Sequence, residues 1–181
     1  MNVWDPFVRL FHWALVLFFF LAYYLEGDWR ELHGHAGYTV ALLVSFRIIW
    51  GFIGTSAARF ANFVVPPRDI SAYLSGFVRG TSEPHAGHDP AGAVMILVLL
   101  TSLLATTITG MSLFAMEGSG PLVGTFVTRW PGHVVEDLHE FFADFTVILV
   151  LVHVAGVLVT SRVHQQNLIA AMITGRKKSR P

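Results

Sequence analysis

The chain reads Asp137-Leu138-His139-Glu140-Phe141-Phe142-Ala143-Asp144-Phe145 at the start of an apolar helix that continues through His153 to Thr160. His139 and His153 are 14 residues apart (153 − 139). That spacing is close to four helical turns, so both rings leave one face, about 21 Å apart along the axis. Two ionisable residues near opposite edges of a hydrocarbon layer about 30 Å thick predict two stacked cofactor sites. On this helix alone, an interfacial His139 and a structural, hydrogen-bonded His153 explain the pattern equally well.

The composition is that of a small integral membrane protein. Of the 181 residues, 54% are hydrophobic and only 13% are charged, which is about half the charged share of a soluble domain. In a helix bundle in lipid, the backbone hydrogen bonds are made within each helix and the exposed side chains are apolar. A soluble fold needs more polar surface. The chain has no cysteine, which excludes disulfides, iron–sulfur clusters and thioether attachment of a prosthetic group.

Four apolar runs predict an all-α fold, a four-helix transmembrane bundle that forms a single domain over residues 1–181. The first run starts near the N-terminus, but no cleavage site of the signal-peptide type follows, and Tyr23, Tyr24 and Trp29 form an aromatic belt instead. We therefore expect it to stay as a spanning helix. The expected spans cover about residues 8–25, 34–54, 91–116 and 138–160.

Residues 55–90 form the longest polar stretch. An amphipathic helix is expected at residues 69–78, on the membrane surface. We interpret His85 and His88 as solvated loop histidines, with metal binding as the less favoured alternative. Asp89-Pro90 then supplies an N-cap and a first helical residue for the third span. One more short helix is expected in the tail, at about residues 166–173.

The basic residues are distributed unevenly about the four spans. Only Arg30 and Arg129 lie on the side of the two acidic loops. The other ten lie on the side of both termini and the 55–90 loop, namely Arg9, Arg47, Arg59, Arg68, Arg79, Arg162, Arg176, Lys177, Lys178 and Arg180. Because cytoplasmic loops carry the excess of Lys and Arg, the pattern predicts cytoplasmic N- and C-termini.

With this topology, four histidines form two pairs, one near each membrane face. His12 and His153 lie in the cytoplasmic halves of their helices, whereas His33 and His139 open theirs from the outer side. Haem b that carries electrons takes two axial imidazoles and is held in the core of a helical bundle. Zinc requires three or four ligands at one point, which two separated pairs do not provide. The histidines therefore predict two haem b groups with bis-histidine ligation.

The neighbouring residues refine this assignment. His33 and His35 point about 200° apart on a helix, so they cannot serve the same face. Gly37, four residues after His33, would let a flat macrocycle approach the backbone, and we favour His33 over His35 as the ligand. Arg47 lies 14 residues after His33 (47 − 33) and on the same face. We expect it to pair with a haem propionate, with an interfacial arginine that reaches water as an equal alternative.

The sequence resembles the bacterial di-haem cytochrome b561 family, which includes the cytochrome b subunits of nickel–iron hydrogenases. The resemblance covers nearly the whole chain, and the order and spacing of its pieces are more specific than any piece alone. The matching pieces are Val3-Trp4-Asp5-Pro6-Phe7-Val8-Arg9-Leu10-Phe11-His12-Trp13, Glu31-Leu32-His33 with Gly37-Tyr38, Arg47 with Trp50-Gly51-Phe52, Gly87-His88-Asp89-Pro90, Leu138-His139-Glu140, His153-Val154-Ala155-Gly156, and residues 167–177. Family members often have Asn where Asp89 stands, and either residue caps a helix.

The resemblance implies a multi-pass protein of the bacterial inner membrane with two b haems, exchanging electrons with the quinone pool. Our leading hypothesis is an electron conduit between a periplasmic donor, such as a c-type cytochrome or oxidoreductase subunit, and ubiquinone or menaquinone. The alternative is an enzyme, a superoxide oxidase, which would require a cationic pocket at the outer haem. A haem-free structural or transport bundle is the third hypothesis. We expect the protein to contact membrane lipid and these redox partners, and we expect it not to bind nucleic acid.

Reduction of a quinone consumes protons, so its site requires a polar lining near water. The cytoplasmic side offers Arg9, Arg47, Arg162 and His164 as groups that would hydrogen-bond a quinone carbonyl. We therefore expect quinone beside the His12/His153 haem. The alternative is that these cations only hold propionates and lipid phosphates, and His133 and His35 keep the outer side open as a quinone site.

Overall fold

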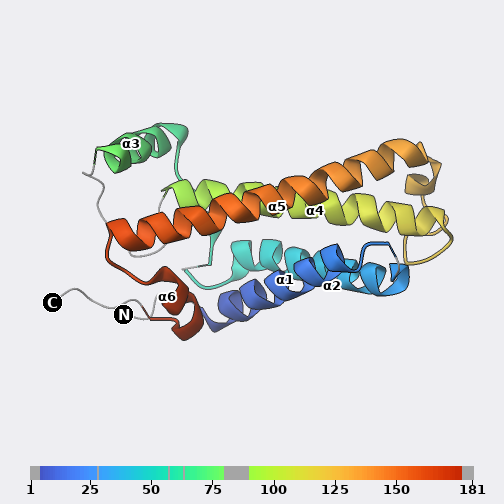
Figure 1. Cartoon of the computed structure of the whole chain (residues 1–181), viewed down its shortest axis with the longest axis horizontal. Coiled ribbons are helices and arrows are strands. Elements are labelled where there is room, and N and C mark those ends of the chain that lie inside the picture. Colours follow the sequence, from blue (N-terminus) through green and yellow to red (C-terminus); the bar gives the residue numbers. More distant parts are fainter. Residues whose placement is uncertain (1–4, 28, 57, 63, 80–89, 177–181) are drawn as a thin grey trace. The chain divides into compact units, whose positions relative to one another are not determined.

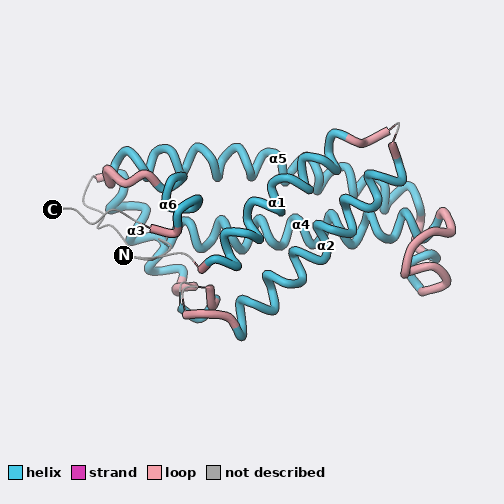
Figure 2. Tube along the Cα trace, turned by 90° about the horizontal axis from the view of Figure 1, so that it is seen from below, coloured by secondary structure: helices cyan, strands magenta, loops and turns pink. Residues whose placement is uncertain are grey.

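The computed structural model describes residues 5–27, 29–56, 58–62, 64–79 and 90–176. Within these ranges every regular element is a helix, as Figures 1 and 2 show. The elements are α1 (Pro6–Tyr24), α2 (Arg30–Ile53), η1 (Phe60–Asn62), α3 (Pro67–Val78), α4 (Pro90–Met116), η2 (Phe126–Arg129), α5 (Gly132–Val163) and α6 (Leu168–Thr174). The predicted cap at Asp89 and the histidines His85 and His88 lie outside the described residues.

In the described part of the chain, four helices are long and apolar enough to cross a membrane, namely α1, α2, α4 and α5, with 19, 24, 27 and 32 residues. The prediction of an all-α fold with four spanning helices is confirmed. Helix α5 begins at Gly132, before the expected residue 138, because the amides of Val134 and Val135 bond to the carbonyl of Pro131. The polar residues Glu136 and Asp137 are therefore part of the helix and precede its apolar run.

The outer surface of these helices is apolar. Tyr24 is 87% exposed, and Leu42, Phe52 and Ile53 are each 70% exposed. Monomers in water seldom expose so many large hydrophobic side chains, whereas lipid solvates them. The chain is a multi-pass membrane protein.

The chain divides into two compact units, and each long helix contributes a segment to both. Unit 1 holds Met1–Leu10, Arg47–Val98 and Leu149–Pro181, and unit 2 holds Phe11–Phe46 and Leu99–Ile148. The single domain expected from the sequence stays a prediction, and the two units are described separately below.

In unit 2, contacts link the four helix segments in a closed ring. His33 of α2 bonds to the carbonyl of Ala22 in α1, and the ring of Tyr38 in α2 packs edge-on against Phe114 in α4. The α4 and α5 segments are joined by a buried hydroxyl pair, Ser102 Oγ to Thr146 Oγ1, at 2.7 Å. The hydroxyl of Tyr23 in α1 donates to Asp144 in α5 at 3.0 Å. Small hydroxyl residues of this kind let membrane helices pack closely.

In unit 1, polar contacts fix the ends of the helices. The carboxylate of Asp5 caps α1 by accepting from the amide of Phe7 at 2.7 Å, and it also accepts from Thr55 Oγ1 at 2.6 Å. The guanidinium of Arg9 donates to the carbonyls of Met172 and Ile173 at the end of α6. A cation at a helix C-terminus is favourable because unpaired carbonyls gather there.

Candidate functional site

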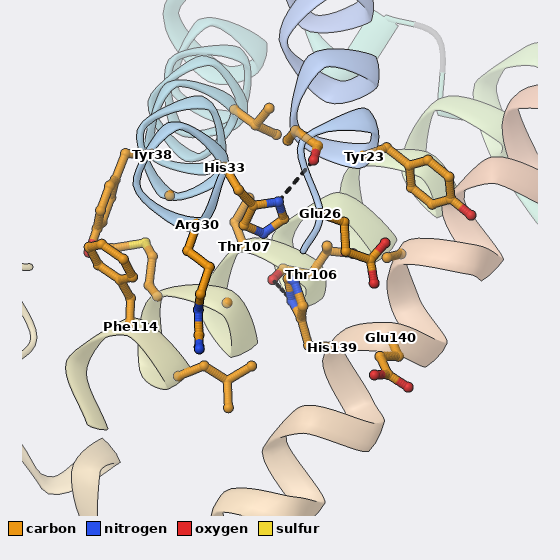
Figure 3. Close-up of a pocket in the computed structure, with 18 of the residues that line it drawn as sticks. Tyr23, Glu26, Arg30, His33, Tyr38, Thr106, Thr107, Phe114, His139 and Glu140 are labelled. Carbon is orange, nitrogen blue, oxygen red and sulfur yellow. Dashed lines mark hydrogen bonds between the residues drawn. The ribbon is translucent and has the colours of Figure 1, made fainter. Parts of the chain in front are cut away.

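A cavity of about 580 Å³ lies within unit 2, between the segments of α1, α2, α4 and α5. Figure 3 shows the rings of His33 and His139 pointing toward each other in this cavity, one from α2 and the other from α5. Its apolar lining includes Phe19, Leu103, Leu113 and Phe114. A largely apolar cavity of this size with a few convergent polar groups is typical of a cofactor site.

The two histidine rings are held in a defined orientation. Their centroids are 6.0 Å apart and their planes are inclined by 86°. In His33, Nδ1 lies 2.9 Å from the carbonyl oxygen of Ala22, and in His139, Nδ1 lies 3.0 Å from the carbonyl oxygen of Thr106. Each Nδ1–H therefore donates to a backbone carbonyl, which leaves the Nε2 lone pair of both rings available to a metal.

Helix α4 is shaped to receive the ring of His139. A Cβ atom added at Gly110 would lie 2.7 Å from Cε1 of His139, closer than real Cβ contacts, so only glycine leaves room for the ring there. The hydroxyl of Thr109 lies 3.3 Å from Nδ1 of the same ring. Because Thr106, Thr109 and Gly110 all come from one turn of α4, this turn sets the position of the imidazole.

These residues fit a haem. A metal bound between two imidazoles, about 2 Å from each nitrogen, separates the ring centroids by about 6 Å, which agrees with the 6.0 Å observed between His33 and His139. Gly37 lines the cavity, and a Cβ atom added there would meet nothing within 4 Å, so the space beside its backbone is open. Among the described residues, no three His, Cys, Asp or Glu side chains converge on a point. Two imidazoles suit a macrocycle-bound iron rather than a bare zinc ion.

The polar part of the lining is acidic. Five carboxylates line the cavity, from Glu26, Glu117, Glu136, Glu140 and Asp144, against one Lys or Arg side chain, Arg30. The guanidinium of Arg30 forms an ion pair with Glu117. This lining repels anions, so it does not supply the cationic pocket that the superoxide hypothesis requires.

The other predicted residues of unit 2 lie in different surroundings. His35 is exposed, and its Nδ1 lies 2.6 Å from the carbonyl oxygen of Glu31 in the same helix. It is not among the residues that line the cavity, whereas His33 is. His12 is half-buried, with its ring edge-on to Trp13 at 5.1 Å between centroids. The ligand roles of His12, His33 and His139 stay predictions.

In unit 1, Arg47 is only 3% exposed, which does not fit an arginine that reaches water. Its guanidinium carbon lies 4.9 Å from the ring centroid of Phe60, and its Nη1 has no hydrogen-bond partner in the described part of the chain. A cation buried in this way requires an anionic partner. His153 is half-buried in the same unit.

The side chains predicted to hydrogen-bond a quinone differ in burial and in the contacts that they already make. The guanidinium of Arg9 is engaged by the end of α6, so it is a structural group in this conformation. His164 is 8% exposed, whereas Arg162 is exposed.

Sequence reasoning missed several groups that shape the cavity. The carbonyls of Ala22 and Thr106 carry no side-chain signal, because every residue has one. The acidic lining had a visible signal, since Glu140 and Asp144 follow His139 and, four residues apart, share a helix face with each other. Tyr38 also lines the cavity, and its hydroxyl has no hydrogen-bond partner among the residues that the structure describes.

Curated relatives of this chain are named as cytochrome subunits. The chain is 29% identical over 172 residues to a protein of Azotobacter vinelandii named "Probable Ni/Fe-hydrogenase B-type cytochrome subunit", covering 84% of this chain and 69% of the relative. A relative of the same name in Cupriavidus necator is 26% identical over 211 residues, covering 96% and 85%. No solved structure gives a significant match.

Two facing histidine rings in a largely apolar cavity between membrane-spanning helices fit a b-type cytochrome that transfers electrons. The sequence profile of one family, described as Prokaryotic cytochrome b561, matches residues 3–175. On this match, the chain belongs to the prokaryotic cytochrome b561 family.

Proposed function

We propose that this membrane b-type cytochrome holds two haem b groups and carries electrons between a periplasmic donor and the quinone pool. The observation that carries the proposal is the convergence of His33 and His139 on one cavity, with both Nδ1 atoms engaged by backbone carbonyls. Haem b, when bound, supplies a one-electron iron couple. The hydrogen bonds from His33 and His139 to backbone carbonyls would hold both rings in position for such a group.

The second haem is assigned to His12 and His153 from their helical register in the sequence. Support comes from Arg47, a buried cation in unit 1 whose Nη1 lacks a hydrogen-bond partner within the described residues. A haem propionate is an anion that would satisfy it. The ring of Phe60 covers one face of the guanidinium, which leaves the edges for a carboxylate.

The proposed function also includes the orientation in the membrane, the electron donor and the position of the quinone. The distribution of Lys and Arg supports both termini on the cytoplasmic side of a bacterial inner membrane. The relatives are named as hydrogenase subunits, so the donor we propose is a periplasmic oxidoreductase or a c-type cytochrome. Ubiquinone or menaquinone then takes the electrons beside the His12/His153 haem, where Arg162 and His164 supply polar groups.

Single-histidine variants test this function. His33→Ala and His139→Ala should each remove one haem and leave the other, and His12→Ala and His153→Ala should remove the second haem and leave the first. His35→Ala is the matched control, since it lies two residues from His33 outside the cavity lining, and it should keep both haems. Haem content and reduced-minus-oxidised spectra report the result. Loss of the same haem in His35→Ala but not in His33→Ala would overturn the ligand assignment.

A further inference from the structure

The lining of the unit 2 cavity includes a buried hydroxyl group, that of Tyr38. Its oxygen is shielded from solvent, and it makes no hydrogen bond with any residue that the structure describes. A buried polar group without a partner destabilises the protein, and such groups are rare in native structures. The phenol O–H is a hydrogen-bond donor, so it calls for an acceptor that the occupant of the cavity supplies.

The ring of Tyr38 is held in place by its neighbours. It packs edge-on against Phe114 of α4, with the ring centroids 5.9 Å apart. Its hydroxyl lies against Gly120, in the loop between α4 and η2, where an added Cβ atom would overlap the hydroxyl oxygen. Gly120 also has a φ of +85°, a conformation that favours glycine. The helices α2 and α4 and this loop therefore fix the position of the hydroxyl.

Most other side-chain donors that line the cavity are already engaged within the protein. Each hydroxyl or imidazole donor reaches a carbonyl or carboxylate oxygen, in the pairs Thr106–Ser102, Thr107–Leu104, Tyr23–Asp144, His33–Ala22 and His139–Thr106. The guanidinium of Arg30 is paired with Glu117, although its five N–H groups are more than one carboxylate uses. Within the described lining, Tyr38 therefore carries the one hydroxyl donor that is still open.

A haem b group brings acceptors that match this donor. It carries two propionate side chains, and a hydrogen bond to an ionised carboxylate is about twice as strong as one between neutral groups. In the view of Figure 3, Tyr38 and Phe114 stand on one side of the His33–His139 pair, and Tyr23 and Glu140 stand on the other. Because few donors in this lining are open, they decide where a propionate can lie.

We propose that Tyr38 is a cofactor-binding residue, whose hydroxyl donates to a propionate oxygen of the haem held by His33 and His139. This inference rests on the proposed function, because it requires a haem in the unit 2 cavity. The two imidazoles hold the iron, and the hydroxyl of Tyr38 anchors the edge of the macrocycle. Tyr38 therefore affects how long the haem is retained and not which residues ligate it.

The first test removes this hydroxyl alone. Tyr38→Phe keeps the ring that packs against Phe114, so the holoprotein should be purified with its haem. The holoprotein is mixed with apomyoglobin, haem loss is followed in the Soret region, and the phase that is missing in His33→Ala identifies the unit 2 haem. This phase should be about tenfold faster in Tyr38→Phe than in the wild type. Tyr24→Phe is the matched control, since Tyr24 is 87% exposed and does not line the cavity, and it should release haem at the wild-type rate.

Haem with esterified propionates separates anchoring of the haem from support of the fold. Haem dimethyl ester carries no ionised carboxylate, so the wild type and Tyr38→Phe reconstituted with it should release it at nearly equal rates. Equal release of natural haem from the two proteins would overturn the proposal. A tenfold difference that persists with the dimethyl ester would also overturn it, because the hydroxyl would then act only on the fold. A single haem per chain that is lost in His33→Ala would instead refute the two-haem function, without changing what these rates decide.

Discussion

A single added methyl group should loosen the His33/His139 site. In Gly110→Ala the new Cβ would lie 2.7 Å from Cε1 of His139 and 3.1 Å from its Nδ1. Atoms of this kind rest about 3.5–4.0 Å apart, so the imidazole must retreat by about 1 Å. Its hydrogen bond to the carbonyl of Thr106, now 3.0 Å long, would lengthen to about 4 Å, which is beyond bonding range.

The expected cost follows from that broken bond. A buried donor left without its acceptor costs about 1–3 kcal/mol, and loss of an outer-shell partner of a metal-bound histidine weakens metal affinity by about 10–100-fold. Alanine favours a helix over glycine by about 1 kcal/mol. The fold itself should therefore not be destabilised through helix propensity, and the effect should fall on the haem.

The assay is haem retention. Detergent-purified Gly110→Ala is incubated with apomyoglobin as a haem acceptor, and the loss of the Soret band is followed over time. We expect faster loss of one haem and an unchanged rate for the other. Gly132→Ala is the control, since a Cβ there meets nothing within 4 Å. If Gly110→Ala is folded and releases both haems at the wild-type rate, the reasoning from the α4 turn is refuted.

Three further predictions follow from other contacts. Thr146→Val removes the buried hydroxyl pair with Ser102 and should lower the free energy of unfolding by about 1 kcal/mol in a denaturation titration, and an unchanged midpoint would contradict this. Arg9→Gln removes the donors to the end of α6 and should speed hydrogen exchange in Leu168–Thr174 only, whereas equal exchange would show that the contact is dispensable. The near-perpendicular histidine planes should give a strongly anisotropic low-spin signal in electron paramagnetic resonance of the oxidised protein, and the signal of parallel ligands would exclude this geometry.

The sequence contained most of the fold, because each span is a long apolar run between polar or Gly/Pro-rich segments. It also singled out His33 and His139, since helical period and membrane depth place them on one level without any knowledge of packing. It favoured His33 over His35 because Gly37 lies on the same face, and the structure places Gly37 in the cavity lining.

The rest of the site depends on contacts between distant parts of the chain. Arg30 and Glu117 are 87 residues apart, and their pairing follows only from the packing of α2 beside α4. The carbonyl of Thr106 accepts from His139 because the packing of α4 against α5 brings this turn of α4 to the ring. Every residue has a backbone carbonyl, so the sequence carries no signal for this partner. The contact of Arg47 with the ring of Phe60, thirteen residues on (60 − 47), depends on how the chain folds back after α2, and the pairing of Arg47 with a propionate stays a prediction.

The most direct test of the central claim is the number of haems per chain. A pyridine haemochrome assay on the purified protein, with the protein concentration taken from quantitative amino-acid analysis, gives that ratio without any assumption about ligands. We predict two haem b groups per chain, both released by acidified acetone because the chain has no cysteine to hold them covalently. A ratio of one, or haem that stays with the protein after this extraction, would contradict the account.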